Sequence, residues 1–165
     1  MLACYDALAS GLPTAGEDAH MTNVTASLKN GTAVDLRTRR FLWRSDEPKQ
    51  VGGADSGPTP YEFLLGSLAA CTAMTLRLHA NNTNVPLSGV DVTLECDREH
   101  AEDCTSPAPA DDLMTGIQSR ITIHGPVTEL QRAQLTQVAE ECPVHKLLAN
   151  PIPISDTVRF TDSTD

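Results

Sequence analysis

The fold of this chain is decided by one stretch, residues 59–76, which reads TPYEFLLGSLAACTAMTL. It predicts a helix that begins at Pro60, because Thr59 can cap the helix and Glu62 completes a capping box. The apolar pattern continues to about Ala80. Apolar side chains cover almost every face, which is typical of a helix buried on all sides. We therefore expect a central helix covered by a sheet and by a partner helix, from this chain or from another subunit.

The segments around this helix predict strands and one more helix. Before it, residues 24–28 alternate between apolar and polar side chains and precede Asn30-Gly31, a strong hairpin signal. Residues 33–45 predict one or two further strands.

After the helix, residues 89–96 and 117–123 predict two strands. A second helix is predicted from Thr128, with another capping box, to Pro143, and residues 152–160 predict a last strand. This order of strands, helix, strands, helix and strand indicates an α+β fold with a largely antiparallel sheet.

The composition narrows the class of protein. A formal net charge of -10 argues against binding to nucleic acid or to an anionic membrane. The longest apolar stretch, residues 63–76, is interrupted by polar residues and is predicted to be too short to span a bilayer. Gly11 and Pro13 break the apolar run near the N-terminus, so no secretory signal is predicted. We expect a cytoplasmic protein with a flexible leader over residues 1–20 and one domain over residues 21–165.

Two of the five cysteines stand out. Cys71 lies in the middle of the first predicted helix, and Cys142 shares the apolar face of the second. Either cysteine alone is typical of a small buried core residue. Two such helices in one small domain pack against each other or against the same sheet. A buried dithiol is therefore a hypothesis, although the pattern does not set the distance that a disulfide needs.

Three segments carry a resemblance to a known family. Residues 57–76 resemble the central-helix motif of the OsmC/Ohr family, the osmotically inducible protein C and organic hydroperoxide resistance proteins, and residues 141–146 (ECPVHK) resemble its second-cysteine motif. Residues 100–104 (HAEDC), with Gln131-Arg132, resemble an OsmC-like subgroup sometimes fused to hydrolase domains. The resemblance spans roughly residues 21–161. It implies largely antiparallel sheets, two long central helices and an intertwined homodimer with active sites at the subunit interface.

The resemblance implies a thiol-dependent peroxidase that reduces organic hydroperoxides. Cys71 would attack the peroxide and become a sulfenic acid, and Cys142 would condense with it to form a disulfide. A small dithiol or a thiol protein would then reduce that disulfide by exchange. The expected partners are the hydroperoxide, this reductant and a second copy of the chain, with no cofactor, nucleic acid or membrane.

The resemblance also implies an arginine, held by a glutamate, that stabilises the Cys71 thiolate. Arg44 is the best candidate because it lies on the strand before the loop that leads into the helix, and Arg40 and Arg37 are alternatives. The family acid follows the proline at the helix start, where this chain has Tyr61.

Several acidic residues could take the place of the family acid that is absent at Tyr61. Glu62 stands one residue later, which turns its side chain by about 100° on a helix, and its capping role is the stronger explanation. Asp46 or Glu47 could hold the arginine instead. The tyrosine also supports a second hypothesis, an OsmC-like binding or sulfur-handling module with little peroxidase activity.

Zinc binding is a weaker alternative. Cys96, His100 and Cys104 are spaced four apart, and Cys142 with His145 forms a C-x-x-H pair. These spacings differ from the usual zinc knuckles. A strand-end cysteine, a polar loop and a histidine at a helix end are the plainer interpretation.

Overall fold

The computed structural model describes residues 22–97, 100–105, 116–150 and 152–160. The predicted leader, residues 1–20, lies outside the described residues. The elements in chain order are β1 Thr25–Leu28, β2 Val34–Thr38, β3 Phe41–Ser45, the short 3-10 helix η1 Lys49–Val51, α1 Pro60–Thr83, β4 Gly89–Cys96, α2 His100–Thr105, β5 Ile117–His124, α3 Glu129–Glu140 and α4 Pro143–Leu148.

The helix predicted from the deciding stretch is confirmed as α1, which has 24 residues. Thr59 caps it: its hydroxyl accepts the Glu62 N–H at 3.3 Å, and the Glu62 carboxylate accepts the Thr59 N–H at 2.8 Å. The helix runs three residues beyond the predicted end at Ala80. It stops where Asn84 adopts a left-handed conformation with φ 54°.

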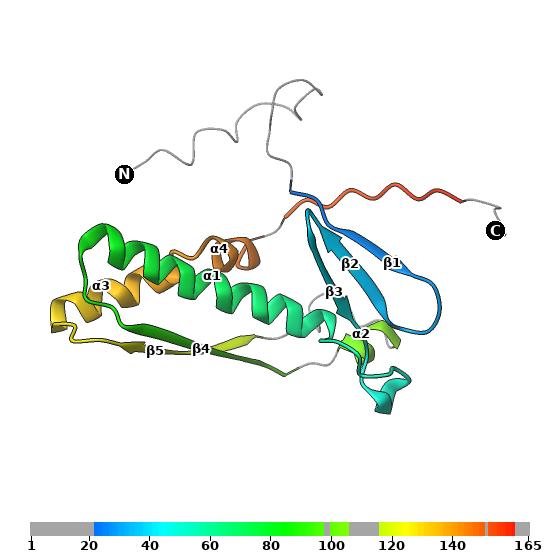
Figure 1. Ribbon diagram of the computed structural model, residues 1–165, viewed down its shortest axis with the longest axis horizontal. Helices are drawn as coiled ribbons and strands as arrows, with labels where there is room; N and C mark the ends of the chain where they lie inside the picture. The colour runs from blue at the N-terminus through cyan, green and yellow to red at the C-terminus, as the bar shows by residue number, and fades with distance from the viewer. Residues whose placement is uncertain (1–21, 98–99, 106–115, 151, 161–165) are drawn as a thin grey trace, which may run out of the picture.

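The strands form two separate antiparallel sheets (Figure 1). One sheet has the order β1-β2-β3, and its first hairpin turns at Gly31, whose φ of 65° suits glycine. The other is the β4–β5 pair, in register from Gly89 opposite His124 to Cys96 opposite Ile117. The predicted α+β class with antiparallel sheets is confirmed.

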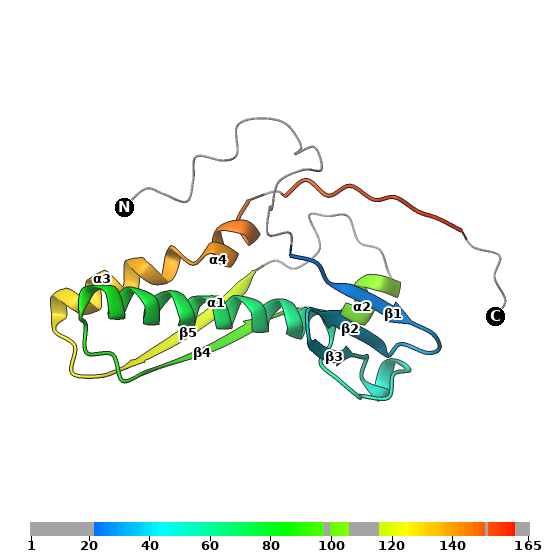
Figure 2. The same ribbon diagram turned by 45° about the horizontal axis from the view of Figure 1, so that its top comes forward.

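The core lies beneath one face of α1. One face of this helix packs against both the β4–β5 pair and the α3–α4 pair, and the three-stranded sheet sits at its N-terminal end (Figures 1 and 2). Leu76 and Leu135 are fully buried between α1 and α3. The remaining core members are apolar residues from α1, the α1–β4 connection, the β4–β5 pair, the β5–α3 connection and α3: Ala80, Val85, Leu87, Val90, Ile121, Ile123, Val127, Val138 and Ala139.

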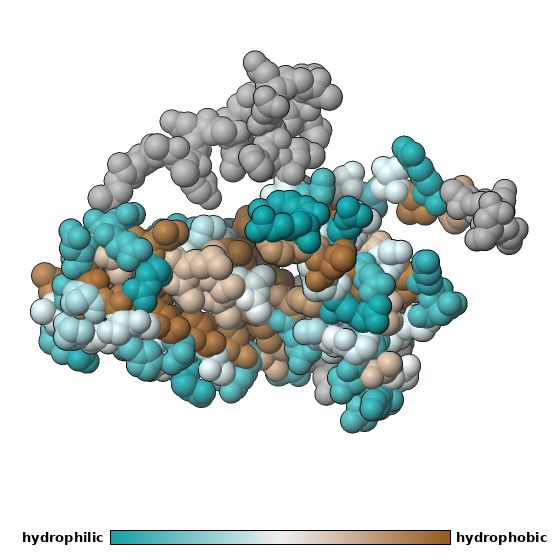
Figure 3. Space-filling view, in the orientation of Figure 1, coloured by the Kyte–Doolittle hydropathy of each residue, from teal (hydrophilic) through white to brown (hydrophobic). Residues whose placement is uncertain are grey.

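The opposite face of α1 is exposed, so the prediction of a helix buried on all sides is wrong for the single chain. Ala70, Met74 and Leu78 follow one another at four-residue spacing, and Met74 and Leu78 are 63% and 62% exposed. Among the residues that the structure describes, protein covers only one side of the helix. Figure 3 shows apolar side chains gathered across the middle of the molecule, where α1 lies, with polar side chains towards the ends.

The length of α1 also changes one expectation. The helix is long and apolar enough to cross a membrane by length and composition alone, so the prediction that this stretch is too short is wrong by that criterion. The core helix of a soluble protein meets the same criterion. Here α1 contacts β4, α3 and α4.

The predicted last strand is not formed within this chain. Residues 152–160 have no strand structure, and Ile152, Ile154, Val158 and Phe160 are 53%, 83%, 74% and 92% exposed. The segment extends from α4 towards the side of the molecule that holds the three-stranded sheet (Figure 1). A strand needs a neighbour that pairs with its backbone groups, and none of β1 to β5 takes that place.

Asp46 organises the loop between β3 and α1. This residue is 2% exposed, and its carboxylate accepts five hydrogen bonds: from the hydroxyls of Thr32 and Ser56 and from the N–H groups of Glu47, Ala54 and Ser56. These hydrogen bonds, led by the one from Thr32, hold the pKa of the Asp46 carboxylate well below its usual range.

The far end of the same loop is fastened to β3. The Ser45 hydroxyl and the Asp46 N–H both donate to the Pro58 carbonyl, at 2.8 and 3.2 Å. Gly57 lies so close to β3 that a Cβ there would meet the Arg44 carbonyl oxygen at 2.3 Å. Glycine is therefore required at this point, and the start of α1 is held beside the end of β3.

We predict that Asp46→Asn lowers the melting temperature at pH 7, because an amide presents a donor where the loop presents only donors. The folded-state pKa of Asp46 is depressed, so its stabilisation is present above the ordinary carboxylate pKa of about 3.9 and is lost as pH falls below it. The difference in melting temperature between parent and variant should therefore shrink from pH 7 to pH 3. Asp35→Asn, at an exposed carboxylate paired with Arg44, is the control. Equal effects of the two substitutions would contradict the role of Asp46.

Candidate functional site

The two predicted cysteines meet beside α1. Cys71 lies in the middle of α1 and is half-buried, and Cys142 is fully buried. The helical path breaks at Pro143 as predicted, but α3 already ends at Glu140. The prediction that Cys142 lies on the apolar face of this helix is therefore wrong, because Cys142 follows α3 and is the N-cap of α4. Both cysteines are reduced thiols and share a hydrogen bond. The structure therefore brings the predicted pair together.

The surroundings of the pair shift the pKa values of the two thiols in opposite directions. Burial raises the pKa of Cys71, and so does its hydrogen bond with Cys142. Burial also acts to raise the pKa of Cys142, but the hydrogen bond from Cys71, the N–H groups of His145 and Val144 and the Thr72 side chain outweigh it. The pKa of Cys142 is lowered as a result. Negative charge is best stabilised on the Cys142 sulfur, at the amide end of α4, while Cys71 holds the shared proton.

Sequence reasoning missed these supporting groups. Thr72 is buried next to Cys71 in α1, and Thr75 lies one turn further along and hydrogen-bonds to the Cys71 thiol. One signal was present in the sequence. A proline directly after Cys142 marks the first residue of a helix, and the N–H groups of the following residues then point at the cap.

An apolar cleft lies next to the thiol pair. Its volume is about 720 Å³, and it lies between α1, β5, α3 and α4. Thr72, which also contacts Cys142, lines the cleft together with His145, which follows Cys142 on α4. The apolar part of the lining comprises Leu64, Leu68, Ile117, Ile121, Ile123, Leu135, Ala139, Leu148 and Ala149.

Arg44 does not lie with the thiols in this chain. Its guanidinium pairs with Asp35, directly opposite on β2, with the Arg44 Nε 2.7 Å from Asp35 Oδ1, and both side chains are about half-exposed or more. The alternative Arg40 stacks over Phe41 at 5.0 Å, and Arg37 is exposed on β2. The cation expected beside Cys71 therefore does not come from these positions within one chain.

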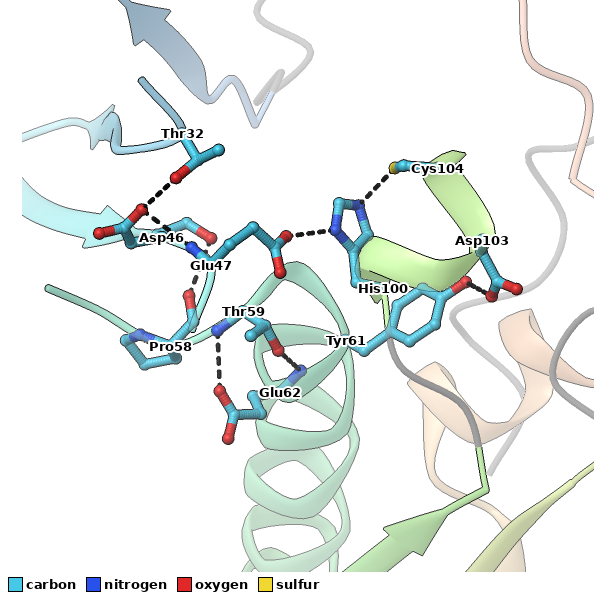
Figure 4. A network of polar contacts seen from close by, with 11 residues as sticks. Thr32, Asp46, Glu47, Pro58, Thr59, Tyr61, Glu62, His100, Asp103 and Cys104 are labelled. Atoms are coloured by element: carbon cyan, nitrogen blue, oxygen red, sulfur yellow. Dashed lines mark hydrogen bonds and ion pairs between the residues drawn. The ribbon is translucent and has the colours of Figure 1, made fainter. Parts of the chain in front are cut away.

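The acids proposed to hold the arginine have other partners. Asp46 is used by its own loop, and Glu47 Oε1 lies 2.5 Å from His100 Nδ1 (Figure 4). Glu62 caps α1, as predicted. The expectation that Asp46 or Glu47 holds Arg44 is therefore wrong, because the strand register already gives Arg44 a carboxylate.

Tyr61 points from the start of α1 towards α2 (Figure 4). Its hydroxyl donates to the Asp103 carboxylate, and its ring meets the His100 ring edge-on at 5.4 Å. At the position of the family acid, this chain thus has a residue that fastens α2 to the start of α1.

The residues weighed for zinc are divided between two places. His100 and Cys104 contact each other on α2, whereas Cys142 is paired with Cys71. Among the described residues, no group of three histidine, cysteine or acidic side chains is arranged to hold a metal ion.

Comparisons with known proteins place this geometry in a family. The sequence profile of the family described as OsmC-like protein matches residues 53–155, and a search of curated proteins finds no match. The fold is similar to that of an OsmC-like protein from Mycoplasma pneumoniae, with a TM-score of 0.64 and 23% identity over 78% of this chain and 87% of that one.

Two further structures share the fold at a TM-score of 0.54 each. One is an organic hydroperoxide resistance protein OsmC from Legionella pneumophila, 19% identical over 80% of this chain and 91% of the other. The second, a putative organic hydroperoxide resistance protein from Vibrio cholerae, holds captopril in one of its active sites and is 20% identical over 82% and 88% of the two chains. The profile match covers well over half of the sequence, and the chain belongs to the OsmC-like protein family.

Proposed function

We propose that this protein is a thiol-dependent peroxidase that reduces organic hydroperoxides with Cys71 and Cys142. The observation that carries the proposal is the hydrogen-bonded pair of reduced thiols on α1 and at the start of α4, beside an apolar cleft. An apolar cleft favours the alkyl group of an organic hydroperoxide over hydrogen peroxide. The names of the Legionella and Vibrio structures, organic hydroperoxide resistance proteins, agree with this class of substrate.

The different exposure of the two thiols supports different roles for them. Cys71 is half-buried and can be reached, whereas Cys142 is fully buried, so Cys71 attacks the peroxide. Cys142 starts as a thiolate that the α4 amides stabilise, and it takes the Cys71 proton across the shared hydrogen bond as Cys71 attacks. The Cys71 sulfur bonds to the distal peroxide oxygen and the O–O bond breaks, so Cys71 becomes a sulfenic acid. The leaving alkoxide takes the proton now held by Cys142 and departs as the alcohol, which returns Cys142 to the thiolate.

The second half of the cycle uses the buried thiol. Cys142 attacks the Cys71 sulfenic acid, and a disulfide forms as water leaves. An external dithiol then reduces the disulfide by two exchange steps and is itself oxidised. Within one chain Arg44 pairs with Asp35. Arg44 can therefore act as the cation beside the Cys71 thiolate only if a second copy of the chain places its Arg44 next to that thiolate.

The orientation of Tyr61 favours a second candidate. Tyr61 binds α2 and leaves no carboxylate at the position where the family has its acid. A protein with this arrangement could be an OsmC-like binding or sulfur-handling module with slow peroxide turnover. Steady-state rates with excess dithiothreitol separate the two candidates, because only the peroxidase turns over faster than free dithiothreitol consumes the same hydroperoxide.

We predict that Cys71→Ser abolishes consumption of cumene hydroperoxide, since a hydroxyl cannot form a sulfenic acid. Cys142→Ser should still react once, and the Cys71 sulfenic acid should then be trapped by dimedone as an adduct visible by mass spectrometry. Cys96→Ser, at a half-buried cysteine on β4, is the matched control and should react like the parent. If Cys71→Ser consumes the hydroperoxide as fast as the parent, the proposed site is wrong.

We also propose that the exposed face of α1 packs against a second copy of the chain. Ala70, Met74 and Leu78 form an apolar stripe on a helix whose other side is already covered, and apolar surface of this kind is stabilised by burial. The exposed apolar residues of the segment 152–160 provide a second surface that a neighbouring chain could cover.

Met74→Glu should therefore shift the protein from dimer towards monomer in sedimentation velocity, because it buries a charge in the stripe. Gln134→Glu adds the same charge at an exposed polar position on α3 and should leave the sedimentation coefficient unchanged. A parent that sediments as a monomer at micromolar concentration would contradict the proposed dimer.

A further inference from the structure

A second cysteine site lies on α2, apart from the Cys71–Cys142 pair. His100 and Cys104 stand one helical turn apart on α2, and Cys104 Sγ lies 3.5 Å from His100 Nε2. The other ring nitrogen, Nδ1, lies 2.5 Å from Glu47 Oε1, which comes from the loop after β3 (Figure 4). The three side chains therefore form one continuous row of thiol, imidazole and carboxylate.

Exposure rises along this row from the acid to the sulfur. The Glu47 side chain is 12% exposed, the His100 side chain is 27% exposed, and Cys104 is an exposed residue. Glu47 is thus the most buried of the three residues, His100 is half-buried, and Cys104 is the most exposed. This is the order expected of a nucleophile that meets its substrate at the surface and of a base that is oriented from behind.

Both supporting groups are held in place by other contacts. Glu47 follows Asp46, its carbonyl accepts the Asp55 N–H at 3.1 Å, and a Cβ at Gly53 would meet that carbonyl at 1.8 Å. His100 is held by the edge-on contact with Tyr61. The loop geometry therefore brings a carboxylate and an imidazole 53 residues apart in the chain into contact.

We propose that Cys104, His100 and Glu47 form a second thiol site that carries out thiol–disulfide exchange with small disulfides. Glu47 accepts the Nδ1–H of His100, which leaves the Nε2 lone pair facing the Cys104 thiol. His100 takes the thiol proton as Cys104 Sγ attacks one sulfur of the disulfide. The disulfide bond breaks, a mixed disulfide forms on Cys104, and the departing thiolate takes the proton from His100. His100 is the catalytic base, and Glu47 is a positioning residue.

The charge around the site selects among small disulfides. The Glu47 carboxylate contacts His100, and the Asp103 carboxylate binds Tyr61, whose ring touches His100. The whole chain has a net charge of -10. A cationic disulfide such as cystamine is therefore attracted, and an anionic one such as oxidised glutathione is repelled.

This site is separate from the proposed peroxidase pair. Tyr61, which touches His100, precedes Cys71 by ten residues of α1, or about 15 Å of helix. Direct exchange between Cys104 and Cys71 within one chain is therefore not part of the proposal. The failure of either site can be observed without the other, because Cys71→Ser leaves the α2 row intact.

The test follows mixed-disulfide formation at each cysteine by peptide mass spectrometry, in the full chain carrying Cys71→Ser and Cys142→Ser, with cystamine at pH 7. An ordinary cysteine with a pKa of about 8.5 is only about 3% thiolate at this pH, so a base that ionises it can accelerate attack by about tenfold or more. Cys104 should react at least tenfold faster than Cys96 in the same molecule. Oxidised glutathione should react more slowly than cystamine.

Single substitutions test the role of the base, His100, separately from that of Glu47, which orients it. His100→Gln should lower the rate of mixed-disulfide formation at Cys104 by about tenfold and leave the rate at Cys96 unchanged. Glu47→Gln should lower the rate at Cys104 less, and Glu47→Asp, which keeps a carboxylate, should restore part of the rate. His124→Gln is the matched control, since it breaks another histidine–carboxylate pair, in which His124 Nε2 lies 2.7 Å from Asp91 Oδ2.

Three results would overturn the proposal. One is a rate of mixed-disulfide formation at Cys104 that equals the rate at Cys96 in the protein that carries only Cys71→Ser and Cys142→Ser. Another is a Cys104 rate that His100→Gln leaves unchanged. The third is faster acylation of Cys104 by p-nitrophenyl acetate than exchange with cystamine at equal concentration, which would make the site an acyl acceptor.

Peroxide consumption by a Cys104→Ser variant with the other cysteines intact should equal that of the parent, and this measurement reports on the proposed peroxidase independently.

Discussion

The buried carboxylate of Asp46 is the constraint on which both thiol sites depend. It accepts hydrogen bonds from the turn before β2 and from both halves of the loop that follows β3. A charge this deeply buried is tolerated only because every part of it is satisfied by a donor. The loop closed in this way places the start of α1, and hence Cys71, and it turns the next residue, Glu47, towards His100.

The two thiol sites use different physical means to handle a sulfur proton. At the buried pair, backbone N–H groups at the start of α4 favour negative charge on Cys142, and the Cys71 thiol donates its hydrogen bond to that sulfur. At the exposed site on α2, a carboxylate orients an imidazole, and the imidazole faces the thiol of Cys104. Tyr61 connects the two regions, because it is part of the first turn of α1 and holds α2 through Asp103 and His100.

The single chain leaves two apolar features without a partner in the part of the fold that the structure describes. One face of α1 is exposed along much of its length, and the segment 152–160 presents alternating apolar side chains to solvent. Both features follow from the sequence pattern: the helix is apolar on nearly every side, and the last segment alternates like a strand. The pattern specifies burial, but it does not say which chain supplies the cover.

The sequence by itself determined what depends on neighbouring residues. Both capping boxes, the hairpin at Gly31 and the break at Pro143 form as predicted, because each rests on hydrogen bonds or steric limits within a few residues. The motifs also sufficed to identify the family, and they named two cysteines that lie in contact in the structure.

Only the tertiary structure decided the charged partners. The strand register pairs Arg44 with Asp35, and the loop carries Glu47 to His100, a residue 53 positions away. The last segment has no strand structure because a strand exists only where another segment pairs with it. Such contacts depend on which distant segments meet in space, and that information is absent from local sequence pattern.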